Sequence, residues 1–253
     1  MTKSTRGFDF LAQVRSAEER CAKETWKTLP KTGKQVPRCL DALGELLSLT
    51  YRAATCHWGC AGPDHTVNHL AVRIAATASA SIRCLTAGYY DESLALTRSI
   101  GELSNLLVLF VRIPGQFEAW RRATRRERLD RFSPFKVRLA LESNNIAPPI
   151  DQERYSALSE SGVHATADMV PGGHNPRRRA VLGHVFQLPG AIVALSELAI
   201  ATAVAGHQVS RLLKMTPEVC AEFDGTVKAI VDGLPGIDIT NVRELLESLG
   251  RDD

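Results

Sequence analysis

The segment 94–113, LALTRSIGELSNLLVLFVRI, is apolar almost all round, and a helix of this character is normally buried in a protein core. Arg98 and Glu102 lie one helical turn apart near its middle, and buried charges are normally paired. We therefore expect the two side chains to share a site of low polarity. Gly101 and Asn105 fall on the same helix face, so a facing segment can approach closely there.

The rest of the chain is also typical of helices. Alanine and leucine dominate, strand-like alternation is nearly absent, and apolar residues recur at three and four. With 253 residues, of which 44% are hydrophobic, the chain can build a sizeable core. Helices are expected near 8–28, 38–57, 66–87, 91–113, 116–131, 134–144, 151–164, 178–213, 217–232 and 240–249.

Turn residues punctuate these helices. Gly88 can supply the left-handed residue that closes one helix, and Asp91 can cap the next, which predicts a tight helical hairpin. Pro189 either kinks a long helix or sits in the first turn of a new one. We predict an all-α bundle at 61–213, with an N-terminal helical extension at 1–60 and a short C-terminal helical tail at 214–253.

Composition excludes several classes of protein. The net charge of +3 is too small to demand a nucleic-acid partner by itself. The first 20 residues contain no apolar run of the kind found in secretory leaders, so a cytoplasmic location is expected. Six cysteines are too sparse for a disulfide scaffold, and reduced thiols are expected at positions 21, 39, 56, 60, 84 and 220.

The segment 185–206, VFQLPGAIVALSELAIATAVAG, is apolar enough to be tested as a membrane span. It contains Gln187, Pro189 and Glu197, and a bare carboxylate in mid-bilayer is costly. A buried core helix explains the same composition, so we expect no membrane partner.

A second polar group lies in YSALSESGVHAT at 155–166. Tyr155, Ser159 and Glu160 occupy the helical turns before His164, and His164 is our candidate partner for the Arg98–Glu102 pair. The alternative is an intrahelical ion pair that only fixes packing.

Together, GYYDESLALTRSIGELSNL at 88–106 and the 155–166 segment resemble the DUF5677 type of bacterial helical protein. That group is similar to the wider HEPN superfamily of helical bundles, which often dimerise, and the resemblance covers roughly 65–205. It implies a homodimer, and it places Arg98, Glu102 and His164 on polar positions that recur in the family. Where the family usually has a bulkier residue this chain has Gly162, so the helix ends there or approaches another backbone.

HEPN ribonucleases carry an arginine followed after four to six residues by a histidine. The stretch RRRAVLGH at 177–184 offers Arg179 and His184 with four residues between them, or Arg178 with five. Such a histidine moves a proton from a ribose 2′-hydroxyl, and the arginine stabilises the charged phosphorane without a metal. The alternative is a basic helix start beside an ordinary histidine.

Basic residues concentrate at 121–138, where eight Lys or Arg accompany two acids, with Trp120, Phe132 and Phe135 nearby. Positive charge beside aromatic rings suits an RNA backbone with splayed bases. The alternative is a solvated helix face with local ion pairs. The candidate RNA-binding residues are Arg121, Arg122, Arg125, Arg126, Arg177 and Arg178.

One segment has the ligand types of a zinc site. CHWGCAGPDHTVNH at 56–69 supplies Cys56, Cys60, His65 and His69, each pair one helical turn apart. The alternative is that the thiols are small core residues beside a helix end and a helix start.

Two functions remain open from these patterns. The first is an RNA-directed protein of the defence or toxin type, and specifically a metal-independent endoribonuclease using His184 or His164 as acid or base. The second is a non-catalytic helical binding module in which Arg98, Glu102 and His164 form an internal polar clamp.

Overall fold

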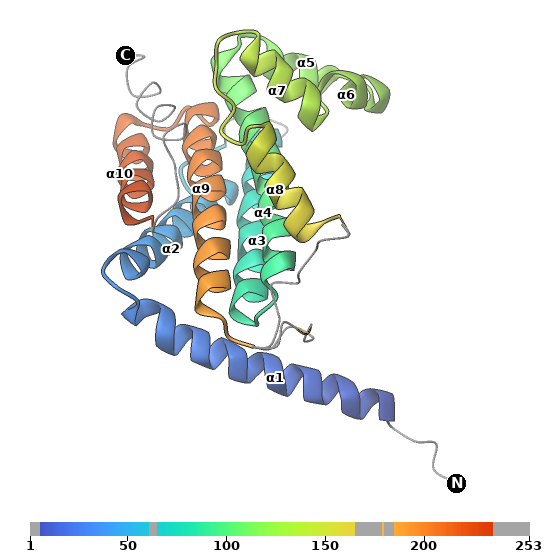
Figure 1. Ribbon diagram of the computed structural model, residues 1–253. Helices are drawn as coiled ribbons and strands as arrows, with labels where there is room; N and C mark the ends of the chain where they lie inside the picture. The colour runs from blue at the N-terminus through green and yellow to red at the C-terminus, as the bar shows by residue number, and fades with distance from the viewer. Residues whose placement is uncertain (1–5, 61–64, 165–178, 180–184, 235–253) are drawn as a thin grey trace.

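The computed structural model describes residues 6–60, 65–164, 179 and 185–234. Within these residues the chain forms ten α-helices and a short 3₁₀ helix and contains no strand (Figure 1), which confirms the all-α prediction. The elements are α1 (Arg6–Thr28), η1 (Leu29–Lys31), α2 (Gln35–Ala54), α3 (Thr66–Thr86), α4 (Tyr90–Arg112), α5 (Gln116–Arg122), α6 (Arg125–Arg131), α7 (Pro134–Glu142), α8 (Gln152–Gly162), α9 (Leu188–Leu212) and α10 (Pro217–Gly233).

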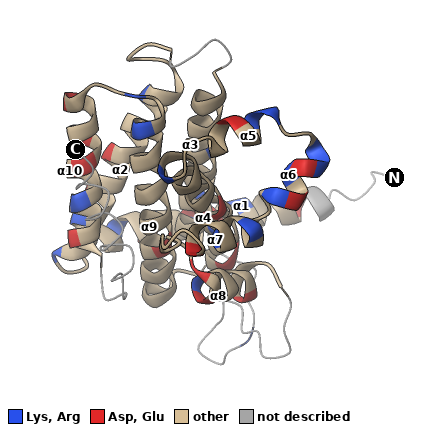
Figure 2. Ribbon diagram, turned by 90° about the horizontal axis from the view of Figure 1, so that it is seen from above, with Lys and Arg blue, Asp and Glu red and all other residues tan. Residues whose placement is uncertain are grey.

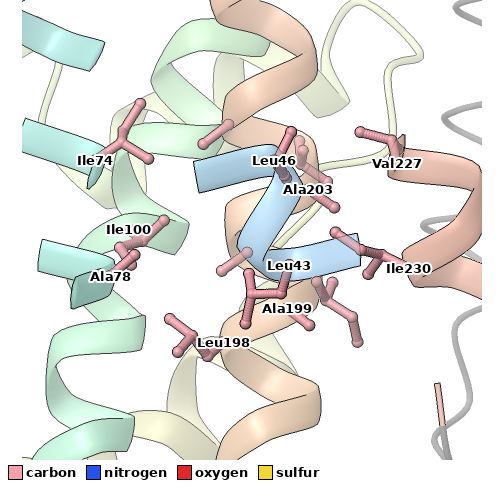
Figure 3. Close-up of a cluster of buried hydrophobic side chains, with 14 of the residues drawn as sticks. Leu43, Leu46, Ile74, Ala78, Ile100, Leu198, Ala199, Ala203, Val227 and Ile230 are labelled. Atoms are coloured by element: carbon pink, nitrogen blue, oxygen red, sulfur yellow. The ribbon is translucent and has the colours of Figure 1, made fainter. Parts of the chain in front are cut away.

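The hydrophobic core lies among α2, α3, α4, α9 and α10, and α4 packs most extensively on α9. Every residue of α9 from Leu198 to Ser210 is buried, and its many alanines let neighbouring helices approach closely. Figure 3 shows side chains from α2, α3, α4, α9 and α10 meeting in one cluster. The expected boundaries at residues 60 and 213 therefore do not divide the core, because α2 and α10 both contribute to it.

Two helices, α4 and α9, are long and apolar enough to cross a membrane. Of their most apolar windows, 56% and 67% respectively are buried inside the bundle. Burial of this kind is what the core helices of a bundle show.

The helix α1 lies across one end of the bundle (Figure 1). The Thr25 hydroxyl donates to the Thr86 carbonyl over 3.0 Å, and the Tyr89 hydroxyl donates to Glu18 over 2.8 Å. These bonds attach α1 to the turn between α3 and α4. Gly88 in that turn has a φ of 87° as predicted, but α4 begins at Tyr90, so Asp91 lies in its first turn rather than at its cap.

The helix expected at 116–131 is two helices, α5 and α6. Thr124 forms a capping box at the start of α6: its hydroxyl accepts from the Glu127 amide, and the Glu127 carboxylate accepts from the Thr124 amide over 2.7 Å. The amide of Thr124 also holds the pKa of Glu127 below its usual value. Neither hydrogen bond could form in a continuous helix, so the capping box explains why the chain breaks between α5 and α6.

The long helix expected at 178–213 begins only at Leu188, with Pro189 in its first turn. This confirms the second alternative for that proline, because a first-turn proline loses no intrahelical bond. The helix expected at 240–249 lies outside the described residues.

Candidate functional site

The predicted pair on α4 forms. Arg98 Nη2 lies 3.2 Å from Glu102 Oε1, and the two side chains are 19% and 31% exposed. They are therefore half-buried at the edge of the bundle rather than enclosed. Arg98 also contacts one aromatic residue on α8.

Two guanidinium groups lie over the ring of Tyr155 of α8. The guanidinium carbons of Arg98 and Arg138 lie 4.5 Å and 4.4 Å from its ring centroid, and Arg98 Nη2 also donates to its hydroxyl. We call Arg98, Tyr155 and Arg138 the arginine–tyrosine stack. It joins α4, α7 and α8, because each helix contributes one of its three side chains.

The role of Arg138 was not predicted from the sequence. It is only 4% exposed, and Arg138 Nη2 donates to Gln152 Oε1 over 2.5 Å. Within the described part of the chain no carboxylate lies within salt-bridge distance of it. A buried cation needs compensation, and the π face of Tyr155 supplies part of it. Its signal in the sequence is a single arginine on the apolar side of a nine-residue helix.

The face of α4 that carries Gly101 and Asn105 receives another segment, as predicted. The Asn105 side chain donates from Nδ2 to the Ile150 carbonyl over 2.8 Å, and its Oδ1 accepts from the Ile150 backbone amide over 3.0 Å. A Cβ on Gly101 would lie 2.7 Å from the Ile150 side chain. This contact fixes the chain just before α8 and sets the register of α8 on α4.

In that register His164 does not join Arg98 and Glu102, so the cluster of these three side chains that the sequence predicted does not form. A Cβ on Gly162 would lie 2.6 Å from the backbone of both Asp91 and Ala95, which precede Arg98 by about 5–10 Å along α4. Since α8 and α4 run antiparallel, His164 lies beyond that point, and its side chain is exposed. Both expectations for Gly162 hold, because α8 ends there against the backbone of α4.

A second feature is the segment α5–α6–α7, which we call the basic arm. At its root Phe117 and Trp120 pack on Phe110 of α4, with ring centroids 5.4 Å and 5.2 Å from that ring. At its other end Arg138 fixes α7 through the arginine–tyrosine stack. Figure 2 shows α5 and α6 to one side of the bundle, with blue segments mixed with red ones along both helices.

The predicted arginines of the basic arm are exposed. Arg121 and Arg122 both contact Glu118, at 2.9 Å and 3.5 Å, while Arg126 lies 3.9 Å from Asp130. Arg125 has no ion pair within the described residues. The local pairs expected of a solvated face are therefore present, but they leave part of the positive charge uncompensated.

The candidate nuclease motif falls largely outside the described residues. His184, Arg177 and Arg178 all lie there. Arg179 is described: it is exposed and outside any helix.

The predicted zinc ligands converge in part. The ligand atoms of Cys56, Cys60 and His65 all lie within 4.8 Å of one another, whereas the ring of His69 is 6.5 Å from that of His65 between centroids. The expectation that the cysteines project from one helix is wrong, because α2 ends at Ala54.

Two further polar clusters were not predicted. Arg154 of α8 pairs with Glu197 of α9 over 2.7 Å, with both side chains about six-sevenths buried. Asp224 of α10 bridges His207 and Arg211 of α9 at 2.9 Å and 2.8 Å. The first cluster joins α8 to α9 and the second joins α9 to α10, so both fasten neighbouring helices.

Comparison with family models, with curated proteins and with solved structures finds no match for this chain.

Proposed function

We propose that this protein is an RNA-binding helical bundle of HEPN-like character, of the defence or toxin type, and that RNA binds on the basic arm. The observation that carries the proposal is the excess of exposed cations there. The exposed cations of the arm are Arg121, Arg122, Arg125, Arg126, Arg131 and Lys136, and its exposed acids are Glu118, Glu127, Asp130 and Glu142.

These acids neutralise only part of the arm. Glu118 is shared by two arginines, and Glu127 is bound in the cap of α6. Arg122 and Arg126 keep side chains that are 77% and 93% exposed despite their ion pairs. Cations this accessible exchange a carboxylate for a phosphate readily, and phosphate contacts of this kind release counterions from the nucleic acid.

The arm also exposes apolar side chains beside its cations. Phe135 is 54% exposed and Leu129 is 63% exposed. An exposed aromatic ring among arginines suits stacking with an unpaired base, which favours single-stranded RNA over a duplex.

The arginine–tyrosine stack then serves as a positioning element rather than a reaction centre. It fastens α7 and α8 to α4, and with them one end of the basic arm. The exposed position of His164, beyond the point where Gly162 meets Asp91 and Ala95, supports this assignment. We therefore propose that the arginine–tyrosine stack has no catalytic role.

Fluorescence anisotropy with a labelled single-stranded RNA tests the proposal. The arm variant carries Arg122→Ala, Arg125→Ala and Arg126→Ala together, since these side chains are exposed and support little packing. Each phosphate contact strengthens binding about 5-fold when the salt concentration falls from about 1 M to about 0.1 M. Loss of three contacts should therefore weaken binding at about 0.1 M salt by about 100-fold.

The matched control removes three exposed cations elsewhere, with Arg38→Ala, Arg73→Ala and Lys228→Ala on α2, α3 and α10. It has the same change in net charge and is expected to bind RNA within a few-fold of wild type. Equal losses in the two triple variants would show that RNA responds only to net charge and would contradict the proposal.

A metal-independent endoribonuclease is the second candidate, favoured by the spacing of Arg179 and His184 in the sequence. Cleavage of the same RNA in the presence of a chelator tests it. Cleavage that disappears in His184→Ala while RNA binding persists would establish the activity. Cleavage that persists in both His184→Ala and His164→Ala would remove both histidines as its acid or base.

A further inference from the structure

The chain after α2 adopts a conformation that normally selects glycine. The amide of His57 donates to the Arg52 carbonyl over 3.0 Å, and the amide of Cys56 donates to the Ala53 carbonyl over 3.3 Å. These two bonds form a Schellman motif, whose left-handed position is usually occupied by glycine. Here Cys56 occupies it with a φ of 56°, at a cost of about 1–2 kcal/mol for a residue with a side chain.

The following turn brings a second thiol back to the first. Gly59 has a φ of 103°, and its amide donates to the Cys56 carbonyl over 2.9 Å. This reversal places Cys60 beside Cys56, so that the spacing of four residues closes without a helix.

A third ligand arrives from the start of α3. His65 also has a left-handed backbone, with a φ of 50°, and its Nε2 lies 3.1 Å from Cys60 Sγ. The Asn68 side chain donates to the Ala53 carbonyl over 2.8 Å, which holds the start of α3 against the end of α2. Two of the three converging side chains are therefore held by backbone conformations that their residue types disfavour.

The distances fit a tetrahedral metal ion. Zinc binds thiolate sulfur at about 2.3 Å and imidazole nitrogen at about 2.0–2.1 Å, so neighbouring ligand atoms lie about 3.5–3.8 Å apart. The ligand atoms of Cys56, Cys60 and His65 lie within 4.8 Å of one another, and small side-chain rotations bring them to those separations. Two thiolates and an imidazole favour Zn²⁺ over the hard cations Mg²⁺ and Ca²⁺.

The geometry points to a Zn²⁺ site formed by Cys56 Sγ, Cys60 Sγ and His65 Nε2, with water as the fourth ligand, that fastens the turn between α2 and α3. Water is assigned because His69 stands outside the group of three converging ligand atoms, with its ring centroid 6.5 Å from that of His65. Cys60 is exposed, which gives solvent access to the site. Binding turns two thiols into thiolates and releases their protons to solvent.

Titration of the full-length reduced protein with Co²⁺, followed by displacement with Zn²⁺, tests the site. We expect one Co²⁺ per chain, with a thiolate charge-transfer band and the visible bands of tetrahedral cobalt. Cys56→Gly is the most informative variant, because glycine suits the left-handed position and preserves the fold while it removes a ligand. It and Cys60→Ala should lose the bands, whereas Cys84→Ala and His69→Ala should retain them.

Thermal unfolding supplies a second readout. Chelation should lower the unfolding temperature of zinc-loaded wild type but leave that of Cys56→Gly unchanged. Absence of the cobalt bands from reduced wild type, or their persistence in Cys56→Gly, would overturn the site. A disulfide between Cys56 and Cys60 that persists in protein purified with reductant would overturn it as well.

Discussion

Substitutions of Tyr155 separate the contribution of its ring to stability from that of its hydroxyl in the arginine–tyrosine stack. Tyr155→Phe keeps the aromatic ring in contact with the two guanidinium groups and removes only the hydroxyl that accepts from Arg98. Tyr155→Leu keeps an apolar side chain but removes the aromatic face. The comparison therefore measures how much stability depends on the ring as a partner for two cations.

The structure sets the expected magnitudes. Arg138 is 4% exposed and lies 4.4 Å from the ring centroid, so its cation–π contact is worth about 2 kcal/mol. Arg98 lies 4.5 Å away with a side chain that is 19% exposed, so its contact is worth about 1 kcal/mol. The hydroxyl contributes about 1 kcal/mol. Tyr155→Phe should therefore lower the free energy of unfolding by about 1 kcal/mol, and Tyr155→Leu by about 4 kcal/mol.

Urea unfolding followed by circular dichroism measures both variants, because urea leaves the ionic strength constant. The contrast between them should persist at high salt, since the contact with the buried Arg138 is poorly screened. Equal losses for Tyr155→Phe and Tyr155→Leu would refute the role of the ring. A loss below about 1 kcal/mol for Tyr155→Leu would do the same.

Two other contacts give predictions of a different kind. Asn105→Ala leaves the buried amide and carbonyl of Ile150 without their partner, so the free energy of unfolding should fall by about 2–5 kcal/mol in urea; a loss under about 1 kcal/mol would show that the pair is dispensable. Burial acts to raise the pKa of Asp224, but the hydrogen bonds and charges of His207 and Arg211 outweigh it and hold that pKa below its usual 3.8. Because the folded pKa is depressed, this stabilisation is present above pH 3.8 and is lost as the pH falls through the folded value. The free energy of unfolding of Asp224→Asn, measured against pH, should lack that step. Identical pH profiles for the wild type and Asp224→Asn would contradict the linkage.

Much of the region around α4 could be predicted because its determinants are local. The spacing of Arg98 and Glu102 brings them onto one helix face, and their ion pair follows from helical geometry alone. Gly101 and Asn105 predict that another segment approaches, since one lacks a side chain and the other can pair with a backbone.

The partner of Arg98 could not be predicted, because it depends on the register of α8 against α4. That register is set by the contact of Ile150 with Asn105 and Gly101, which joins segments about fifty residues apart in the chain. A shift of about two and a half turns decides whether Tyr155 or His164 faces the arginine. Helical periodicity carries no information about such a shift.

The break between α5 and α6 was missed for a different reason. The stretch TRRE at 124–127 is a capping-box signature, but it lies inside a pattern that otherwise predicts one helix. Here the local hydrogen bonds of the cap override periodicity. The break turns the chain at Ala123 and so gives the basic arm its shape.

The dependence of RNA affinity on salt tests the central claim most directly, because it counts the phosphate contacts that the basic arm makes. A plot of the logarithm of the binding constant against the logarithm of salt concentration is measured for wild type and for the triple variant at Arg122, Arg125 and Arg126. With about 0.7 per contact on a single strand, the slope of the variant should be smaller in magnitude by about 2. Equal slopes for the two proteins would contradict the claim that these arginines bind RNA phosphates.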